Sequence, residues 1–419
     1  MARRGERVVV ASGPATAGIV ADFGFERQHL ELGRGSNPGV IRAEHQPGAE
    51  ADSLRGFFDA TRRGMVPTLT YQASQRLTDL MWQPVAKARA TLDVVDAVRP
   101  DTVLVDHLAF SARLALWAAD VRHADVVLGH PSALPVGGEV YGYPPVWPRA
   151  FRPDPGALEE LELLCRRVAA GFTAEWNRAA DGLDPGLPTV DDAFALHGPL
   201  VLYNYPAELA APERTHALPP HHHLGGALRT EAHDPQVEAW LTGGEPFVYV
   251  SFGSFLSVRA DVLARVVEAL RATGVRAAIA TGSTSPDRLG DLPAGWLVRD
   301  YLPQVRLLRD AAVAVTHGGN NSVTESVATG TPMLVLPFST DQFAGAAAVE
   351  DAGMGQALDP NAATVPEIRD ALVRLLDASA SGVPALEGAA GALAADPGPA
   401  RALRAVRSSA GASASSPWR

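Results

Sequence analysis

The chain has 419 residues, and its 36 Lys and Arg residues are outnumbered by 47 Asp and Glu, which gives a net charge of −11. This length predicts two or three domains, the acidic balance excludes a nucleic-acid scaffold, and the 47% apolar residues exclude a largely disordered chain. The one cysteine, Cys165, excludes a disulfide framework or a thiolate metal site. Because the sequence has no apolar run of membrane-spanning length and no signal-like start, we expect a cytoplasmic monomer or homodimer without stable membrane insertion.

Short β-branched runs alternate with longer helical windows along the chain. The runs predicted as strands are 8–12, 102–105, 124–128, 199–203, 247–252, 277–280, 313–316 and 332–336. The windows predicted as helices are 85–98, 158–179, 262–273, 322–329 and 367–376. Continuous apolar strands are typical of parallel sheets covered on both faces, so the pattern predicts an α/β protein with two doubly wound sheets.

Composition suggests where the two halves meet. Residues 206–235 are rich in Pro, Gly and His and lack periodicity. We therefore expect an N-terminal domain at 1–212, a linker at 213–235, a C-terminal domain at 236–400 and a tail at 401–419 that frays from Ser408. The histidine run at 221–223 is a possible metal tract, but such a loop run without a carboxylate partner is more often solvated surface, so no metal site is predicted.

A strand, a glycine turn and a helix form the most informative segment. The turn His317-Gly318-Gly319 follows the strand at 313–316, and Asn321 or Ser322 is the expected N-cap of the helix. The free N–H groups and positive end of a helix N-terminus bind phosphate. The side chains of His317, Asn321 and Ser322 can add donors there.

Carboxylate and amide side chains accompany this turn. Glu325 lies about one helical turn further on, where it can accept two ribose hydroxyls. Asp341 and Gln342 follow the next strand, at the sheet edge where ligands bind in α/β proteins. An acid beside an amide is suited to holding vicinal sugar hydroxyls.

The complete spacing resembles the nucleotide-sugar signature of glycosyltransferase family 1, the UDP-glycosyltransferase-like enzymes that include actinobacterial natural-product glycosyltransferases. It consists of Tyr301-Leu302-Pro303-Gln304, then His317-Gly318-Gly319-Asn320-Asn321-Ser322, then Glu325 and Asp341-Gln342. Residues 247–254 also resemble the strand and loop that open the family's donor domain. The resemblance covers residues 238–358. It implies a GT-B fold, in which two Rossmann-like domains, one for the acceptor and one for the nucleotide sugar, face across a cleft, with an inverting mechanism and no metal.

The resemblance also assigns roles by position. Tyr301 stands where an aromatic ring stacks on the base, and Gln304 where a glutamine supports base and ribose. Glu325 corresponds to the ribose contact, and Asp341 with Gln342 to the sugar-hydroxyl contacts. The positions that match diphosphate contacts or the phosphate-binding turn are Ser254, His317, Gly319, Asn321 and Ser322. Asn320 departs from the usual Trp beside the glycines, which alters contacts near the donor sugar.

The family's usual general base is absent from its usual place. It is a His in Gly-His-x-x-Pro after the first strand, and Ile19 occupies that position here. Alternatively, residues 18–23 form the second strand and the first helix is missing. The sequence alone leaves both alignments open.

Other residues near strand ends can replace this base. Asp106 ends the strand at 102–105 and is similar to the family's orienting Asp. The candidates for the base itself are His107, His130 and Asp22, with His29 and His45 less favoured. A satisfied polar residue at a strand end is the competing interpretation of each histidine.

These observations predict an enzyme that moves a sugar from a UDP- or dTDP-sugar to a hydroxyl of a hydrophobic small molecule. It needs no cofactor beyond the nucleotide-sugar donor and no nucleic-acid partner. The aromatic residues expected either to line the acceptor pocket or to pack in the core are Phe58, Trp82, Phe110, Tyr141, Tyr143 and Trp147. Two alternatives remain: a non-catalytic or weakly active nucleotide-sugar-binding protein, and a GT-B sugar-nucleotide epimerase.

Overall fold

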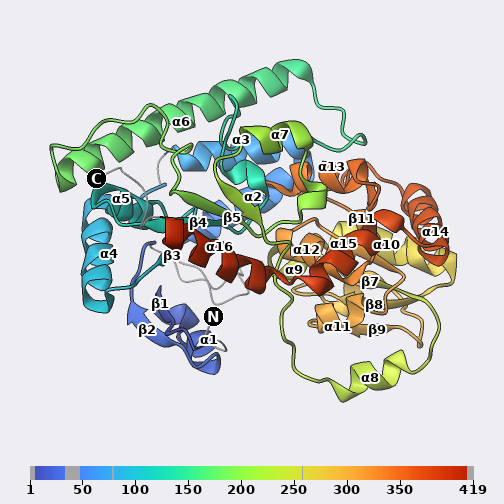
Figure 1. Ribbon diagram of the computed structural model, residues 1–419. Helices are drawn as coiled ribbons and strands as arrows, with labels where there is room; N and C mark the ends of the chain where they lie inside the picture. The colour runs from blue at the N-terminus through green and yellow to red at the C-terminus, as the bar shows by residue number, and fades with distance from the viewer. Residues whose placement is uncertain (1–4, 34–47, 78–79, 257, 413–419) are drawn as a thin grey trace.

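The computed structural model describes residues 5–33, 48–77, 80–256 and 258–412, and shows two lobes, each built on parallel strands (Figure 1). The C-terminal lobe contains a six-stranded sheet in the order β12-β11-β10-β7-β8-β9. Its strands are β7 (Phe247–Ser251), β8 (Arg276–Ala280), β9 (Leu297–Arg299), β10 (Val313–Thr316), β11 (Met333–Val335) and β12 (Gly355–Ala357). The strand order reverses between β7 and β10, which makes this pair the topological switch point.

Helices cover both faces of this sheet. They are α8 (Pro235–Leu241), α9 (Gly253–Leu256), α10 (Ala260–Thr273), α11 (Gln304–Leu308), α12 (Asn320–Thr329), α13 (Gln342–Asp351), α14 (Val365–Ser381) and α15 (Pro384–Ala395). In β7, Val248 and Val250 pack into one apolar cluster, whereas Phe247 and Tyr249 pack into the other. Because both faces are buried, the first four positions of the strand are all hydrophobic rather than every second one, and only Ser251 at its end is polar.

The N-terminal lobe divides its strands between two sheets. The order β3-β4-β5-β6 makes a four-stranded sheet, and β1 pairs with β2 in a separate parallel sheet. These strands are β1 (Val9–Ser12), β2 (Glu26–His29), β3 (Val103–Asp106), β4 (His123–Val127), β5 (Leu200–Tyr203) and β6 (His221–His223). The short helix α1 (Ala17–Asp22) connects β1 to β2, so the alternative that placed a strand at 18–23 is wrong.

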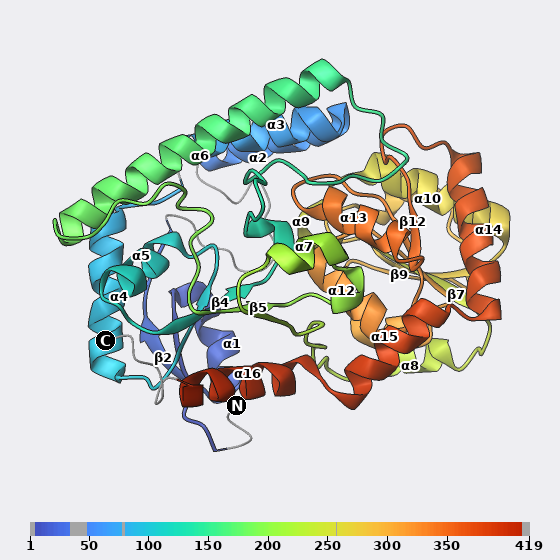
Figure 2. The same cartoon turned by 45° about the horizontal axis from the view of Figure 1, so that its top comes forward.

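Between α1 and the C-terminal lobe in the sequence, six further helices within the described residues pack around the strands of the N-terminal lobe, and one of them is much longer than the others. The helices here are α2 (Gly48–Arg63), α3 (Met65–Arg76), α4 (Pro84–Val98), α5 (Phe110–Ala118), α6 (Pro155–Leu183) and α7 (Pro212–Ala217). Helix α6 has 29 residues and lies beside α3 (Figure 2). Its buried residues include Leu161, Leu164, Val168 and Phe172, which recur every three or four positions and give one apolar face.

The eight predicted strands and five predicted helices all form, most of them with shifted ends. Two expectations are wrong. The histidine run at 221–223 is the edge strand β6, because it pairs with β5. The tail does not fray from Ser408 within the described residues, because α16 (Gly398–Ala412) forms there. No helix of the described ranges combines the length and apolar character needed to cross a bilayer.

Helix α16 brings the end of the chain back to the N-terminal lobe (Figures 1 and 2). Its residues Ala402, Ala405 and Val406 pack in a cluster with Ala124, Leu200 and Leu202 of β4 and β5. Arg407 pairs with Glu6, and Arg122 donates to the carbonyl of Ser409. The last helix is therefore part of the core of the first lobe.

Placing a carboxylate in this core tests the packing. Ala405 is 5% exposed, so Ala405→Glu buries an unpaired charge, and we expect the free energy of unfolding to fall by roughly 2–4 kcal/mol in urea titrations. The control is Ser408→Glu at an exposed position of the same helix, which should change stability by about 0.5 kcal/mol or less. Equal stability of both variants would show that α16 does not pack on the sheet.

Candidate functional site

The predicted donor residues gather at the switch point of the C-terminal sheet. His317 follows β10 and Gly253 follows β7, which pairs with β10. A Cβ added to Gly253 would lie 3.0 Å from Cε1 of His317, and one added to Gly319 would collide with the same imidazole. The ring thus lies between two glycines, which explains the glycine at 319 more directly than a turn preference does.

Helix α12 presents its N-terminus beside this ring. The N-cap is Gly319, with φ −61° and ψ 142°, so the expected cap at Asn321 or Ser322 is wrong and both residues lie inside the first turn. Helix geometry leaves the first N–H groups without intrahelical acceptors. This end can therefore bind an anion, as the sequence predicts.

The predicted ribose side is already hydrogen-bonded within the chain. Gln304 donates from Nε2 to Oε2 of Glu325 over 2.6 Å, and its Oε1 accepts from the hydroxyl of Tyr249 over 3.3 Å. Arg229 donates to both carboxylate oxygens of Glu325, over 2.7 and 2.9 Å. Sequence reasoning missed Arg229, because nothing in the linker signals a partner 96 residues away.

Tyr301 stands apart from this cluster. Its side chain is 66% exposed. It lines a cavity of about 590 Å³ together with Pro303, Arg299 and linker residues 231–236. The ring is thus free to stack on a planar group, as expected for a base contact.

The predicted sugar contacts face the N-terminal lobe. Asp341 accepts the backbone N–H of His130 at Oδ2 over 2.7 Å, and the hydroxyl of Thr340 at Oδ1 over 2.9 Å. Gln342 uses Oε1 to accept the N–H groups of Phe338 and Ser339 over 3.0 and 3.2 Å. Gln342 therefore shapes its own loop, and its amide NH₂ is the part that can serve a ligand.

Asn320 also spans the two lobes. Its Nδ2 donates to the carbonyls of Leu128 and Asn204, over 2.5 and 2.9 Å, at the ends of β4 and β5. Gln72 of α3 accepts the N–H of Thr340 over 3.2 Å. The carboxyl ends of the two sheets thus meet at the donor residues.

His130 is the candidate base that the structure places at this meeting point. Its Nδ1 accepts the N–H of Ser132 over 3.2 Å and lies 2.9 Å from the Ser132 hydroxyl. Burial lowers the pKa of His130 to about 4, although nearby Asp341 acts to raise it. We assign the neutral form with its proton on Nε2, because Nδ1 is used as an acceptor.

His107 and Asp106 do not reach the donor residues. His107 is 1% exposed, and its Nδ1 lies 3.5 Å from Asp125, which Arg113 also contacts at 2.8 Å. Burial acts to raise the pKa of Asp125, but His107, Arg113 and the Gly198 N–H lower it to about 2. Asp106 is exposed and accepts the N–H of Leu108 over 3.0 Å. His107, a candidate for the base, is thus enclosed in a buried ion cluster, and Asp106, the expected orienting aspartate, caps a turn.

The remaining candidates lie elsewhere. Asp22 is exposed on α1, and Ile19 of the same helix is 60% exposed. His29 ends β2 and pairs with Ser12. His45 and the side chain of Ser254 lie outside the part of the chain that the structure describes. The first strand thus contributes no described residue to the donor site.

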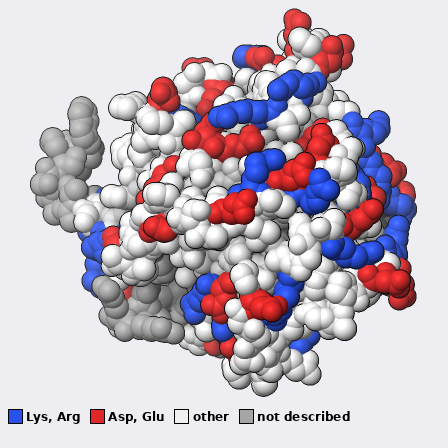
Figure 3. All heavy atoms as spheres, turned by 90° about the vertical axis from the view of Figure 1, so that its right-hand side faces the viewer, with Lys and Arg blue, Asp and Glu red and all other residues white. Residues whose placement is uncertain are grey.

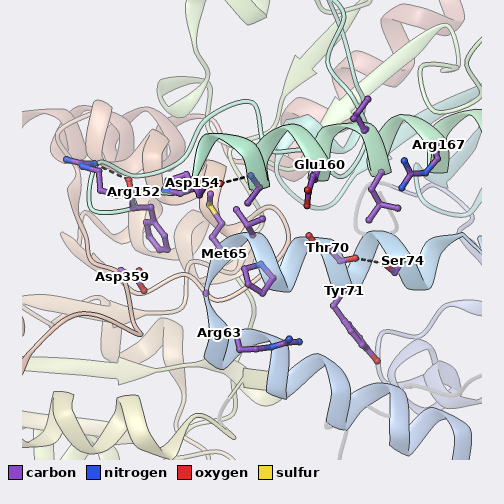
Figure 4. A pocket seen from close by; sticks show the side chains of 18 residues that line it. Arg63, Met65, Thr70, Tyr71, Ser74, Arg152, Asp154, Glu160, Arg167 and Asp359 are labelled. Atoms are coloured by element: carbon purple, nitrogen blue, oxygen red, sulfur yellow. Dashed lines mark hydrogen bonds between the residues drawn. The ribbon is translucent and has the colours of Figure 1, made fainter.

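The larger cavity, about 890 Å³, lies between the α2–α3 turn, the start of α6 and Asp359 (Figure 4). Its lining mixes apolar Met65 with Arg63, Arg152 and Glu160. The predicted aromatic residues do not line it. Phe110 and Tyr141 pack in the core instead, with the Tyr141 ring stacked 3.9 Å from that of Phe194.

Within the part of the chain that the structure describes, neither charged nor metal-ligating side chains indicate a second site. On the face shown in Figure 3, basic and acidic side chains are interspersed. Within the described residues, no group of three or more His, Cys, Asp or Glu is placed to hold a metal ion. His221 and His223 instead contact the ring of Tyr203.

Comparisons with known proteins return glycosyltransferases. Residues 203–381 match the family described as UDP-glucoronosyl and UDP-glucosyl transferase. The oleandomycin glycosyltransferase of Streptomyces antibioticus is 33% identical over 137 residues, 32% of each chain. The zeaxanthin glucosyltransferase of Pseudescherichia vulneris is 29% identical over 295 residues, 68% of this chain and 67% of that one.

The likeness of fold is broader than the likeness of sequence. The solved spinosyn forosaminyltransferase SpnP superposes with a TM-score of 0.66 at 18% identity, over 98% of this chain and 93% of that one. The chain aligns with only about a third of the length of several curated relatives, including the Streptomyces enzyme. Its sequence match to this family therefore covers residues 203–381, whereas its overall fold is the two-domain GT-B fold along nearly the whole chain.

Two histidines of the site, the buried His130 and the half-buried His317, make stability depend on pH. The folded pKa values of His130 and His317 are both lowered to about 4 by burial. The unfolded chain binds these protons below pH 6.5, so stability is complete above 6.5 and is lost as the pH falls toward 4. We expect the free energy of unfolding to drop by roughly 2–4 kcal/mol between pH 7.5 and 4.5.

Urea titrations at both pH values measure this drop. The variant with His130→Gln and His317→Gln should lose less stability on acidification than the wild type. An equal loss in both proteins would show that other groups cause it. Asp125 contributes little in this pH range, because its stabilisation is lost only as the pH falls from its unfolded pKa of 3.8 to its folded pKa of about 2.

Proposed function

We propose that this chain, whose residues 203–381 match a glycosyltransferase family, is an inverting transferase that moves a sugar from a UDP- or dTDP-sugar to a hydroxyl of a hydrophobic small molecule. The observation that carries the proposal is the convergence of His317, the α12 N-terminus and Asp341 at the switch point of the sheet, facing His130. In open α/β sheets, ligands bind at this crevice.

The proposed donor would lie along the edge of the sheet. Tyr301 stacks on the base, Gln304 and Glu325 hold the ribose, and His317 with the α12 N-terminus receives the diphosphate. Asp341 and the amide of Gln342 then bind hydroxyls of the sugar. Because Asp341 and Asn320 now bond the N-terminal lobe, the donor enters as the lobes separate and replaces those contacts.

His130 would act on the reacting centre from the opposite lobe. With Nδ1 held by Ser132, its Nε2–H is a hydrogen-bond donor, suited to a developing negative charge on the leaving phosphate or a sugar oxygen. As a general base it would first have to exchange tautomers and give up the Ser132 contact. We therefore assign it the role of donor.

One observation favours the non-catalytic alternative. The residue at the position of the family's His is Ile19, which lies exposed on α1 rather than in the cleft. A non-catalytic protein would bind the donor but release no nucleotide when acceptor is added. As part of the proposal we keep a cytoplasmic location, supported by the single cysteine, Cys165, which is free and buried.

Nucleotide binding tests the donor site directly. Titration calorimetry with UDP, dTDP and GDP should show binding of UDP or dTDP and weaker binding of GDP. His317→Ala removes the ring beside the phosphate site and Glu325→Ala the ribose carboxylate, so each should weaken binding at least tenfold. A folded wild-type chain that binds none of the three would contradict the donor site.

Two substitutions of His130 separate the roles of donor and base. Nucleotide release in the presence of acceptor measures transfer. His130→Ala should lower kcat on the order of a hundredfold, with nucleotide affinity changed less than about threefold. His130→Gln keeps an amide N–H near the Nε2 position, so it should retain much more activity. Equal loss in both variants would indicate a base, and full activity of the Ala variant would remove His130 from the mechanism.

A further inference from the structure

The carboxylate of Glu325 already accepts three hydrogen bonds from its own chain before any ligand binds. Its side chain is 3% exposed, and Arg229 binds it through two hydrogen bonds of 2.7 and 2.9 Å. Gln304 adds a third, 2.6 Å long, to Oε2. A carboxylate has about four lone-pair positions, so roughly one remains, on Oε1.

The linker holds Arg229 firmly in this place. Two residues later, Glu231 accepts the N–H groups of Val305 and Arg306 over 3.2 and 3.0 Å. Three residues earlier, Gly226 has φ +100°, and a Cβ there would lie 2.8 Å from Cβ of Thr324. The backbone on both sides of Arg229 is thus packed against α11 and α12, and the arginine is part of the site.

Removing the guanidinium from Glu325 is unfavourable. A bidentate arginine–carboxylate pair is among the stronger hydrogen-bonded contacts, and its loss leaves a buried carboxylate without its countercharge. A ribose that needs both oxygens of Glu325 must displace Arg229. A sugar with a single hydroxyl at this place needs only the position that is free.

We propose that Arg229 makes the donor site selective for 2′-deoxyribonucleoside diphosphates over ribonucleoside diphosphates. The inference rests on the proposed donor site and names its substrate class. The 3′-hydroxyl takes the one open position on Glu325, whereas a 2′-hydroxyl loses water and finds no acceptor. Arg229 is therefore a specificity-determining residue.

Calorimetry with dUDP and UDP isolates this effect, because the two ligands differ only at the 2′ position. The full-length wild type should bind dUDP roughly fivefold or more tightly than UDP. Arg229→Met frees the carboxylate, so the preference should fall to parity or reverse. Arg229→Lys keeps the positive charge but has a single point of contact, so its preference for dUDP over UDP should lie between those of the wild type and Arg229→Met. It also provides a second variant if Arg229→Met folds poorly.

The matched control is Arg306→Met. Arg306 pairs with Glu238 through bonds of the same lengths, 2.7 and 2.9 Å, in the same lobe, and its loss should leave the preference unchanged. Equal affinity of the wild type for both ligands, or a preference that survives both Arg229 substitutions, would overturn the role of Arg229 alone. Failure of the folded wild type to bind either ligand would overturn the donor site and the inference with it.

Discussion

The structure depends on the polar contact between the two sheet edges. Asp341 accepts the N–H of His130, and Asn320 donates to two carbonyls at the ends of β4 and β5. Around these bonds, Tyr205 of the first lobe shares an apolar cluster with Val335 and Ala346 of the second. Backbone groups at strand ends lack partners in their own sheet, so each lobe satisfies the other. A ligand between the lobes must offer equivalent hydrogen bonds to both.

Much of the C-terminal lobe could be predicted from the sequence, because its signals are local. A strand buried on both faces is apolar throughout, and a glycine turn marks the start of a helix, as at residues 313–322. The cap was misplaced because Asn and Ser are favoured cap residues, whereas Gly319 is required by the adjacent ring of His317.

The rest of the site was not predictable, because it depends on distant partners. His107 is an attractive base until Asp125 and Arg113 are seen to enclose it. His130 has the same appearance in the sequence, yet it lies against Asp341, 211 residues away. Periodicity carries no information about which strand end faces the other lobe, so two similar histidines received the same expectation.

Helix α16 has a consequence for exchanging halves between related enzymes. The polypeptide passes from the first lobe to the second near residue 224, but its last helix returns and packs on Leu200 and Leu202. A hybrid protein with one junction, at the linker, would pack the last helix of a different enzyme against this sheet. The resulting mismatch would lie far from either ligand. A second junction before Gly398 keeps the native helix with its own sheet, so exchanging lobes between enzymes of this fold requires two junctions rather than one.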